Sequence, residues 1–132
     1  MRLATVALLA ALALPLVACG DEEPTDREKV TATVRTFGGA TAAKDYGRLC
    51  RDILAAELVT RIQQAGLTCQ DALQTGLQGV RDPQVTVGAI TVEGDRATAE
   101  VRTTATGQPP SADRLRLVRQ GDGWRIASLA TP

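Results

Sequence analysis

VEGDRATA, at residues 92–99, is the most specific indication of secondary structure in this chain. Gly94-Asp95 stands between two runs of alternating residues, which is typical of a tight β-hairpin turn. The run before it, residues 85–92, contains a phase slip at Gly88-Ala89 that predicts a β-bulge. The run after it continues to Thr106, with one face made of Ala97, Ala99, Val101 and Thr103 and the other of Arg96, Thr98, Glu100 and Arg102. The segment therefore predicts two antiparallel strands.

Two further strands are expected after this hairpin. Residues 107–112 contain Pro109-Pro110 and predict a longer loop, because proline cannot donate to a strand ladder. The elements that follow are a third strand at residues 113–120 with Leu115 and Leu117 inward, a turn at 121–123 and a last strand at 124–126. The second half of the chain is therefore expected to form a four-stranded antiparallel meander.

The first half of the chain has helical periodicity instead. Thr25 and Glu28 fit a capping box, and Val30, Val34 and Phe37 recur on one face of the helix that follows. Gly38-Gly39 weakens this helix and suits the close approach of another backbone. Three shorter helices are expected at residues 46–52 after Asp45 as cap, at 54–64, and from 69 onward after Thr68 as cap. Helices followed by an antiparallel sheet predict an α+β fold in which the helices cover one sheet face.

The N-terminus has the three parts of an export signal. Arg2 is a short positive region, residues 3–17 are almost all Ala, Leu and Val, and Leu16-Val17-Ala18-Cys19 resembles the lipobox of bacterial lipoproteins. The resemblance implies cleavage between Ala18 and Cys19, with diacylglycerol on the thiol and a fatty acyl chain such as palmitate on the new amine. The alternatives are a transmembrane helix, for which the run is too short and contains Pro15, and an ordinary secretory signal.

This interpretation divides the chain into three parts. Residues 1–18 are the signal peptide, residues 19–24 a lipidated acidic tether, and residues 25–132 one domain. The expected location is the extracytoplasmic face of the cell membrane, held through the lipid on Cys19.

Composition excludes several classes of function. Cleavage removes Arg2 and leaves 14 basic against 15 acidic residues, and the chain has only three aromatic residues, so no nucleic-acid partner is expected. The absence of histidine removes His-based acid–base chemistry and most zinc sites. No metal and no cofactor is expected.

Two cysteines remain once Cys19 carries lipid. Cys50 and Cys69 form an even pair in an exported, oxidising setting, which favours a disulfide. Two free buried thiols are the alternative.

The order of these elements resembles the nuclear transport factor 2-like domain, the cystatin-like α+β cone. The resemblance covers about residues 25–129 and rests on the turn at Lys44-Asp45-Tyr46, the 92–99 hairpin, and the closing pair formed by residues 115–118 and 121–126. It implies a curved sheet wrapped around the first helix, with an apolar cavity between them. Relatives of this kind include isomerases, cyclases, transport adaptors and envelope accessory domains, so the fold does not fix the function.

Three functions follow as hypotheses. The first is a non-catalytic binding or accessory domain that holds a small apolar ligand or an envelope protein. The second is a cofactor-free isomerase or cyclase, which needs a buried carboxylate base. No inward strand position is predicted to carry one: Asp45 is expected to cap a helix, Asp52 and Glu57 to lie on the surface, and Glu100 and Asp113 to lie outward or at a strand start. The third is a structural domain that forms a homodimer through its sheet.

No catalytic residue is therefore assigned. The candidates for the cavity wall are Val34, Phe37, Tyr46, Leu117 and Trp124. Packing in the core is the competing interpretation for the three aromatic residues, and a buried Trp124 is expected to donate its N–H to a nearby carbonyl.

Overall fold

The computed structural model describes residues 20–130, so the predictions for the signal peptide, the cleavage site and Cys19 lie outside the described residues. Gly20 to Pro24 is exposed and has no regular structure. The elements that follow are α1 (Asp26–Ala42), α2 (Tyr46–Arg48), the π-helix η1 (Leu49–Ile53), α3 (Ala56–Gln64), α4 (Cys69–Gly76), β1 (Gln84–Glu93), β2 (Arg96–Ala105), β3 (Gln108–Gln120) and β4 (Gly123–Ala130). None of these helices is long and apolar enough to cross a membrane.

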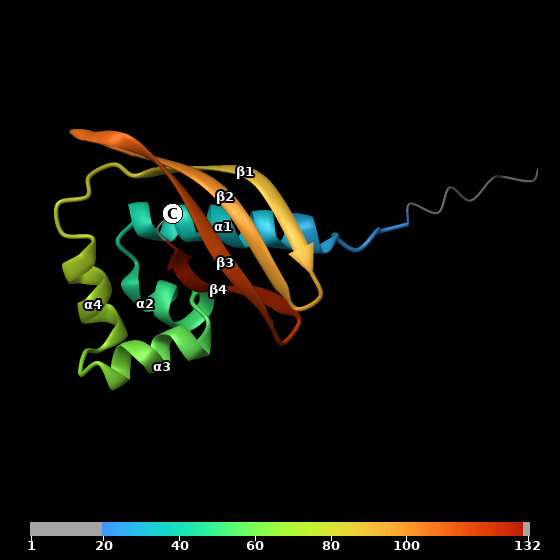
Figure 1. The fold of residues 1–132 in the computed structure, drawn as a ribbon, viewed down its shortest axis with the longest axis horizontal. Helices are drawn as coiled ribbons and strands as arrows, with labels where there is room; N and C mark the ends of the chain where they lie inside the picture. The colour runs from blue at the N-terminus through green and yellow to red at the C-terminus, as the bar shows by residue number, and fades with distance from the viewer. Residues whose placement is uncertain (1–19, 131–132) are drawn as a thin grey trace, which may run out of the picture.

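The strands form one antiparallel sheet in the order β1-β2-β3-β4, so every neighbour in the sheet is also a neighbour in sequence. The β1–β2 and β3–β4 hairpins both close through two-residue Gly-Asp turns, in which Gly94 and Gly121 have φ of 58° and 60°. The predicted bulge at Gly88-Ala89 is confirmed by the register shift between Val87 and Ile90. Figure 1 shows the resulting curved sheet lying across α1, with the shorter helices beside it.

The predicted loop at residues 107–112 is wrong. β2 ends at Ala105, Thr106-Gly107 makes the turn, and β3 starts at Gln108 and runs through Pro109-Pro110. The two prolines are tolerated because β4 pairs with β3 only from Arg114 onward, so this part of β3 has a free edge. The pairing of β2 with β3 changes register between Thr103 and Ala105, next to this turn.

The helix α1 packs against the concave face of the sheet. The capping box at its start is confirmed, since the Thr25 N–H donates to Glu28 Oε2 at 2.7 Å and the Glu28 N–H donates to Thr25 Oγ1 at 3.3 Å. Val30 and Val34 are fully buried. A close approach is present at Gly38, but to a side chain and not to a backbone, because a Cβ there would lie 3.1 Å from the Cβ of Val85 on β1, while Gly39 has nothing within 4 Å.

The shorter helices are joined to the rest of the fold by a disulfide and by backbone hydrogen bonds. Cys50 in η1 and Cys69 at the start of α4 form a disulfide with their Cα atoms 6.0 Å apart, so the disulfide interpretation is confirmed. The predicted start of the third helix at residue 54 is wrong. Leu54 forms a parallel bridge with Ile126 on β4, and the Ala55 N–H donates to the Ile126 carbonyl at 2.8 Å, so the helix begins at Ala56.

A cluster of polar side chains, here called the N-terminal clasp, fixes the first turn of α1 to the sheet. Arg119 donates two hydrogen bonds to the Asp26 carboxylate, at 3.0 and 2.9 Å, and one to Asp95 at 3.1 Å. The Arg119 guanidinium carbon also lies 4.7 Å from the centre of the Trp124 ring. The Trp124 N–H donates to Asp26 at 3.2 Å, so its partner is a carboxylate and not the carbonyl that was expected.

The hydrogen bonds of the clasp change the pKa of Asp26. The hydrogen bonds from Arg119, followed by that from Trp124, lower the pKa of Asp26 below its ordinary value of 3.8. The clasp therefore favours an ionised Asp26 in the first turn of α1.

Candidate functional site

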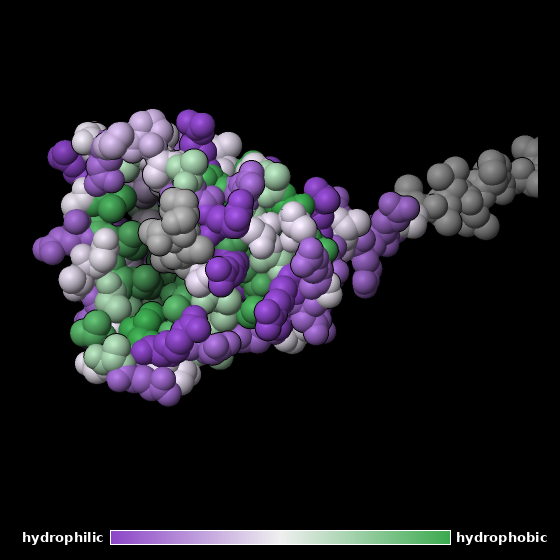
Figure 2. All heavy atoms as spheres, in the orientation of Figure 1, coloured by the Kyte–Doolittle hydropathy of each residue, from purple (hydrophilic) through white to green (hydrophobic). Residues whose placement is uncertain are grey.

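An apolar cavity of about 510 Å³ opens at the end of the sheet farthest from the first turn of α1. It lies between the second half of α1, the residues that join α4 to β1, and the β2–β3 hairpin. Figure 2 shows hydrophobic residues gathered around a hollow on this half of the molecule. The apolar wall includes Phe37, Leu77, Val80, Pro83, Val85, Val101 and Leu115. A cavity of this size is within the range of small-molecule sites.

The strands place polar side chains on the same wall toward the hairpin. On β3, alternate residues face the concave side, so Asp113 lies on the same face as the buried Leu115 and Leu117. Asp113 is half-buried, and its Cα pairs with that of Val101, whose side chain is also buried. The Ser111 hydroxyl donates to Asp113 Oδ2 at 2.7 Å. A carboxylate and a hydroxyl therefore lie beside the apolar part of the cavity.

The prediction that no inward strand position carries a carboxylate is wrong. It placed Asp113 at the start of its strand, where alternation does not define a face. Because β3 begins at Gln108, Asp113 lies in the middle of the strand and shares its face with Leu115. The alternation in register with Leu115 and Leu117 is the signal that identifies it.

The five candidates for the cavity wall separate into two groups. Phe37 lines the cavity. Val34, Leu117 and Trp124 are 0%, 1% and 3% exposed and lie in the hydrophobic core, while Tyr46 packs against that core and is half-buried. The core fills the part of the sheet nearer the start of α1, so the cavity begins farther along α1 than the sequence indicated.

The other acidic residues considered in the sequence lie elsewhere. Asp45 accepts a hydrogen bond from the Arg48 N–H at 3.0 Å, so its expected role as a helix cap is confirmed. Asp52 and Glu57 form exposed ion pairs with neighbouring arginines, at 3.0 and 3.3 Å, as expected of surface charges.

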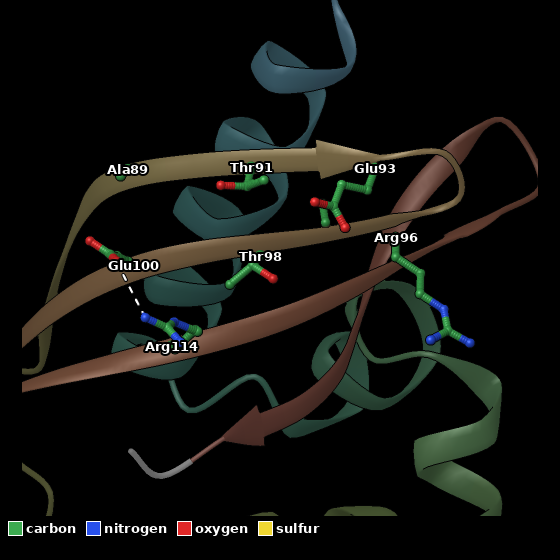
Figure 3. A pocket seen from close by; sticks show the side chains of 8 residues that line it. Ala89, Thr91, Glu93, Arg96, Thr98, Glu100 and Arg114 are labelled. Atoms are coloured by element: carbon green, nitrogen blue, oxygen red, sulfur yellow. Dashed lines mark hydrogen bonds and ion pairs between the residues drawn. The ribbon is translucent and has the colours of Figure 1, made fainter.

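The outer face of the sheet carries two depressions, of about 270 and 800 Å³, that are lined by charges of both signs. Figure 3 shows one of them, with Glu93, Arg96, Thr98, Glu100 and Arg114 projecting from β1, β2 and β3. Glu100 and Arg114 form an ion pair at 3.5 Å, and both side chains are more than half exposed. An exposed pair of this kind contributes little binding energy, so the concave cavity is the stronger candidate site.

No group of acidic or cysteine side chains in residues 20–130 is arranged to hold a metal ion. Cys50 and Cys69 are both used by the disulfide. The described part of the chain therefore offers a cavity with one carboxylate as its main chemical feature.

The sheet, the long first helix and the open concave end together define the nuclear transport factor 2-like fold, the α+β cone. No protein-family model matches the chain, and no curated protein sequence matches it.

Solved structures that resemble the chain support the same fold. An NTF-2-like protein of unknown function from Silicibacter pomeroyi has a TM-score of 0.54 at 22% identity, over 75% of this chain and 87% of that one. A de novo designed NTF2-fold protein has a TM-score of 0.55 at 14% identity, over 83% and 90% of the two chains. A SEC-C motif containing protein from Rhodopseudomonas palustris has a TM-score of 0.53 at 17% identity, over 74% and 73%. At these identities the similarity establishes the fold alone.

Proposed function

We propose that this protein is a binding module without catalytic activity that holds a small apolar ligand in its concave cavity. The single observation that supports this most strongly is the open cavity of about 510 Å³ with a mainly apolar wall. Its wall also includes the end of the β2–β3 hairpin and the residues between α4 and β1, which the sheet and α1 hold in place.

We further propose that the domain is a lipoprotein, anchored through Cys19 to the extracytoplasmic face of the membrane. The lipobox-like sequence supports the anchor, and the exposed Gly20 to Pro24 segment supports a spacer. The tether enters at Asp26, whereas Phe37 lines the cavity eleven positions farther along α1, a distance of about 17 Å along the helix axis. In an anchored protein the cavity would open away from the tether.

A binding titration with a neutral apolar probe tests the cavity. Dodecanol, below its solubility limit, should bind the wild-type domain in isothermal titration calorimetry with one site per chain. The variant Thr103→Phe places a ring in the cavity and should abolish binding, because Thr103 lines it. Thr98→Phe is the matched control, since Thr98 is on the same strand but lines the outer face. Binding that survives Thr103→Phe would contradict the proposal.

Mass spectrometry of the protein purified from membranes tests the anchor. The mature chain should begin at Cys19 with diacylglycerol on its sulfur, and Cys19→Ser should release the protein from the membrane fraction. A chain that still begins at Met1, or an unmodified Cys19, would contradict lipidation.

The presence of Asp113 in the cavity favours one second candidate, a cofactor-free isomerase or cyclase. Such chemistry needs an oxyanion donor beside the base, and Tyr46 packs against the core instead of lining the cavity. Exchange of the α-protons of an apolar cyclic ketone in D₂O, followed by NMR, separates the two functions. Exchange that is catalysed by the wild type and lost in Asp113→Asn would establish the enzyme.

The third hypothesis, dimerisation through the sheet, has less support. Among residues 20–128, whose side-chain exposure is described, the exposed large hydrophobic residue is Leu67, which lies between α3 and α4 and not on the sheet. The outer sheet face carries exposed arginine, glutamate and threonine side chains. Large homodimer interfaces are usually more apolar than this face.

A further inference from the structure

The cavity wall changes in character along its length. The part against α1 and the middle of β3 is apolar and includes Phe37, Val85 and Leu115. Toward the β2–β3 hairpin the wall includes Ser111, Gln108 and the carboxylate of Asp113. A ligand that fills this space would therefore meet an apolar surface along one part and a negative charge at another.

The carboxylate of Asp113 has capacity for a further partner. Ser111 donates to Oδ2, and Oδ1 receives no hydrogen bond from any side chain or backbone group of residues 20–130. Asp113 forms no ion pair in the same part of the chain, although arginines lie on the outer face of its own strand. An ionised carboxylate can accept up to about four hydrogen bonds, so one side of the group remains available.

No positive charge lines this cavity within the described residues. Its wall contains neither lysine nor arginine, and Asp113 is its one ionisable side chain. Asp113 therefore supplies the one charge that the described residues bring to the cavity wall, while Arg102, Arg114 and Arg116 line a depression on the outer face that also includes Asp113.

We propose that the ligand is an amphiphile with a protonated amine head, whose ammonium group pairs with Asp113 while its apolar chain lies against Phe37 and Leu115. The inference rests on the proposed binding function and names the class of ligand. A primary ammonium can donate hydrogen bonds to Oδ1, and its positive charge would pair with the negative carboxylate of Asp113. A ligand with a carboxylate head is excluded, because its negative charge would lie beside that of Asp113 in a half-buried site.

Three probes that share one chain length test the head group. Dodecylammonium, dodecanol and dodecanoate, each below its critical micelle concentration, are titrated into the protein with its disulfide intact at neutral pH and low salt. Wild type should bind dodecylammonium at least about tenfold more tightly than dodecanol, because a hydrogen bond to a charged group is stronger than one between neutral groups. It should bind dodecanoate more weakly than dodecanol.

Two variants assign this preference to the carboxylate. Asp113→Asn should bring the affinity for dodecylammonium to within about threefold of that for dodecanol, while the affinity for dodecanol stays as in the wild type. Asp122→Asn is the matched control, because Asp122 is an exposed residue of the β3–β4 turn and lies outside the cavity wall. It should leave all three affinities unchanged. Thr103→Phe should abolish binding of the amine, which separates binding in the cavity from adsorption to the acidic tether.

The outcomes distinguish the inference from the function on which it rests. Equal binding of the three probes, with loss in Thr103→Phe, would overturn the amine assignment and leave the apolar binding function standing. A preference for the amine that persists in Asp113→Asn would also overturn the assignment. Absence of binding by all three probes would overturn both.

Discussion

Removal of the Cys50–Cys69 disulfide is expected to lower the free energy of unfolding by about 3 kcal/mol. The two cysteines are 19 positions apart in the sequence. Opening a loop of that length restores unfolded-state entropy equivalent to about 3 kcal/mol at 25 °C. Cys69 is 6% exposed, so truncation to alanine also leaves a small void, but this adds less than about 1 kcal/mol.

Urea unfolding of the double variant Cys50→Ala, Cys69→Ala provides the measurement. Trp124 is the only tryptophan and lies in the core, so its fluorescence reports on the sheet and the N-terminal clasp. The midpoint should fall, the melting temperature should drop by roughly 10–20 °C, and the m-value should rise because the unfolded chain becomes less compact. Wild type treated with a thiol-free reductant should reproduce the variant.

The reasoning would be refuted by a folded wild type without free thiols whose double variant loses less than about 1 kcal/mol. That result would mean that the segment between the two cysteines is already constrained in the unfolded chain. A loss in the variant that reduction of the wild type does not reproduce would assign the effect to packing at Cys69 instead.

Three further predictions test the packing and the clasp. Gly38→Ala should destabilise the protein, because the new Cβ would lie 3.1 Å from the Cβ of Val85. Gly39→Ala, where nothing lies within 4 Å of the new Cβ, should instead stabilise the protein by up to about 1 kcal/mol in the same urea assay. Equal effects of the two substitutions would contradict the packing of α1 on β1. Leu117→Ala should cost about 3 kcal/mol because this side chain is 1% exposed, and a cost below about 1 kcal/mol would place it outside the core. The pKa of Asp26 is lower in the folded state than its ordinary value of 3.8, so the stability it contributes is present above that value and lost as the pH falls toward the folded-state pKa. Thermal melts across the acid range should therefore show a weaker loss of stability in Asp26→Asn than in the wild type, and identical pH profiles would contradict the clasp.

Local patterns were sufficient to predict much of the fold. Gly94 and Gly121 mark the two tight hairpins because their turns require positive φ, and the phase slip at Gly88 marks the bulge. The capping box at Thr25 identifies the start of α1 to the residue. Each of these features depends on residues within a few positions of one another, which is the range over which sequence patterns are informative.

The features that were missed depend on distant segments. Leu54 has the spacing of a helical residue, but pairing with Ile126 on β4 holds it in extended conformation. Trp124 finds its hydrogen-bond partner in Asp26, 98 positions earlier in the chain. No local pattern encodes either contact, because tertiary pairing overrides propensity at both places.

The candidate site was predicted less well than the fold. Of the five candidates for the cavity wall, only Phe37 lines it, and Asp113 was missed because Pro109-Pro110 suggested a loop and moved the predicted start of β3 to Asp113 itself. The free edge of β3 at the prolines, which makes the longer strand tolerable, depends on where β4 ends and is not visible in the sequence of β3 alone.

The N-terminal clasp has a consequence for the order in which the protein assembles. A ribosome makes α1 first and β4 last, yet Asp26 in the first turn of α1 is bound by Arg119 and Trp124 near the other end of the chain. Each β-hairpin can close as soon as its own two strands have emerged, and β1, which packs on α1 where Val85 meets Gly38, is made well before β4. The first turn of α1 is thus among the last parts of the fold to be fixed, because Arg119 and Trp124 belong to the last two strands.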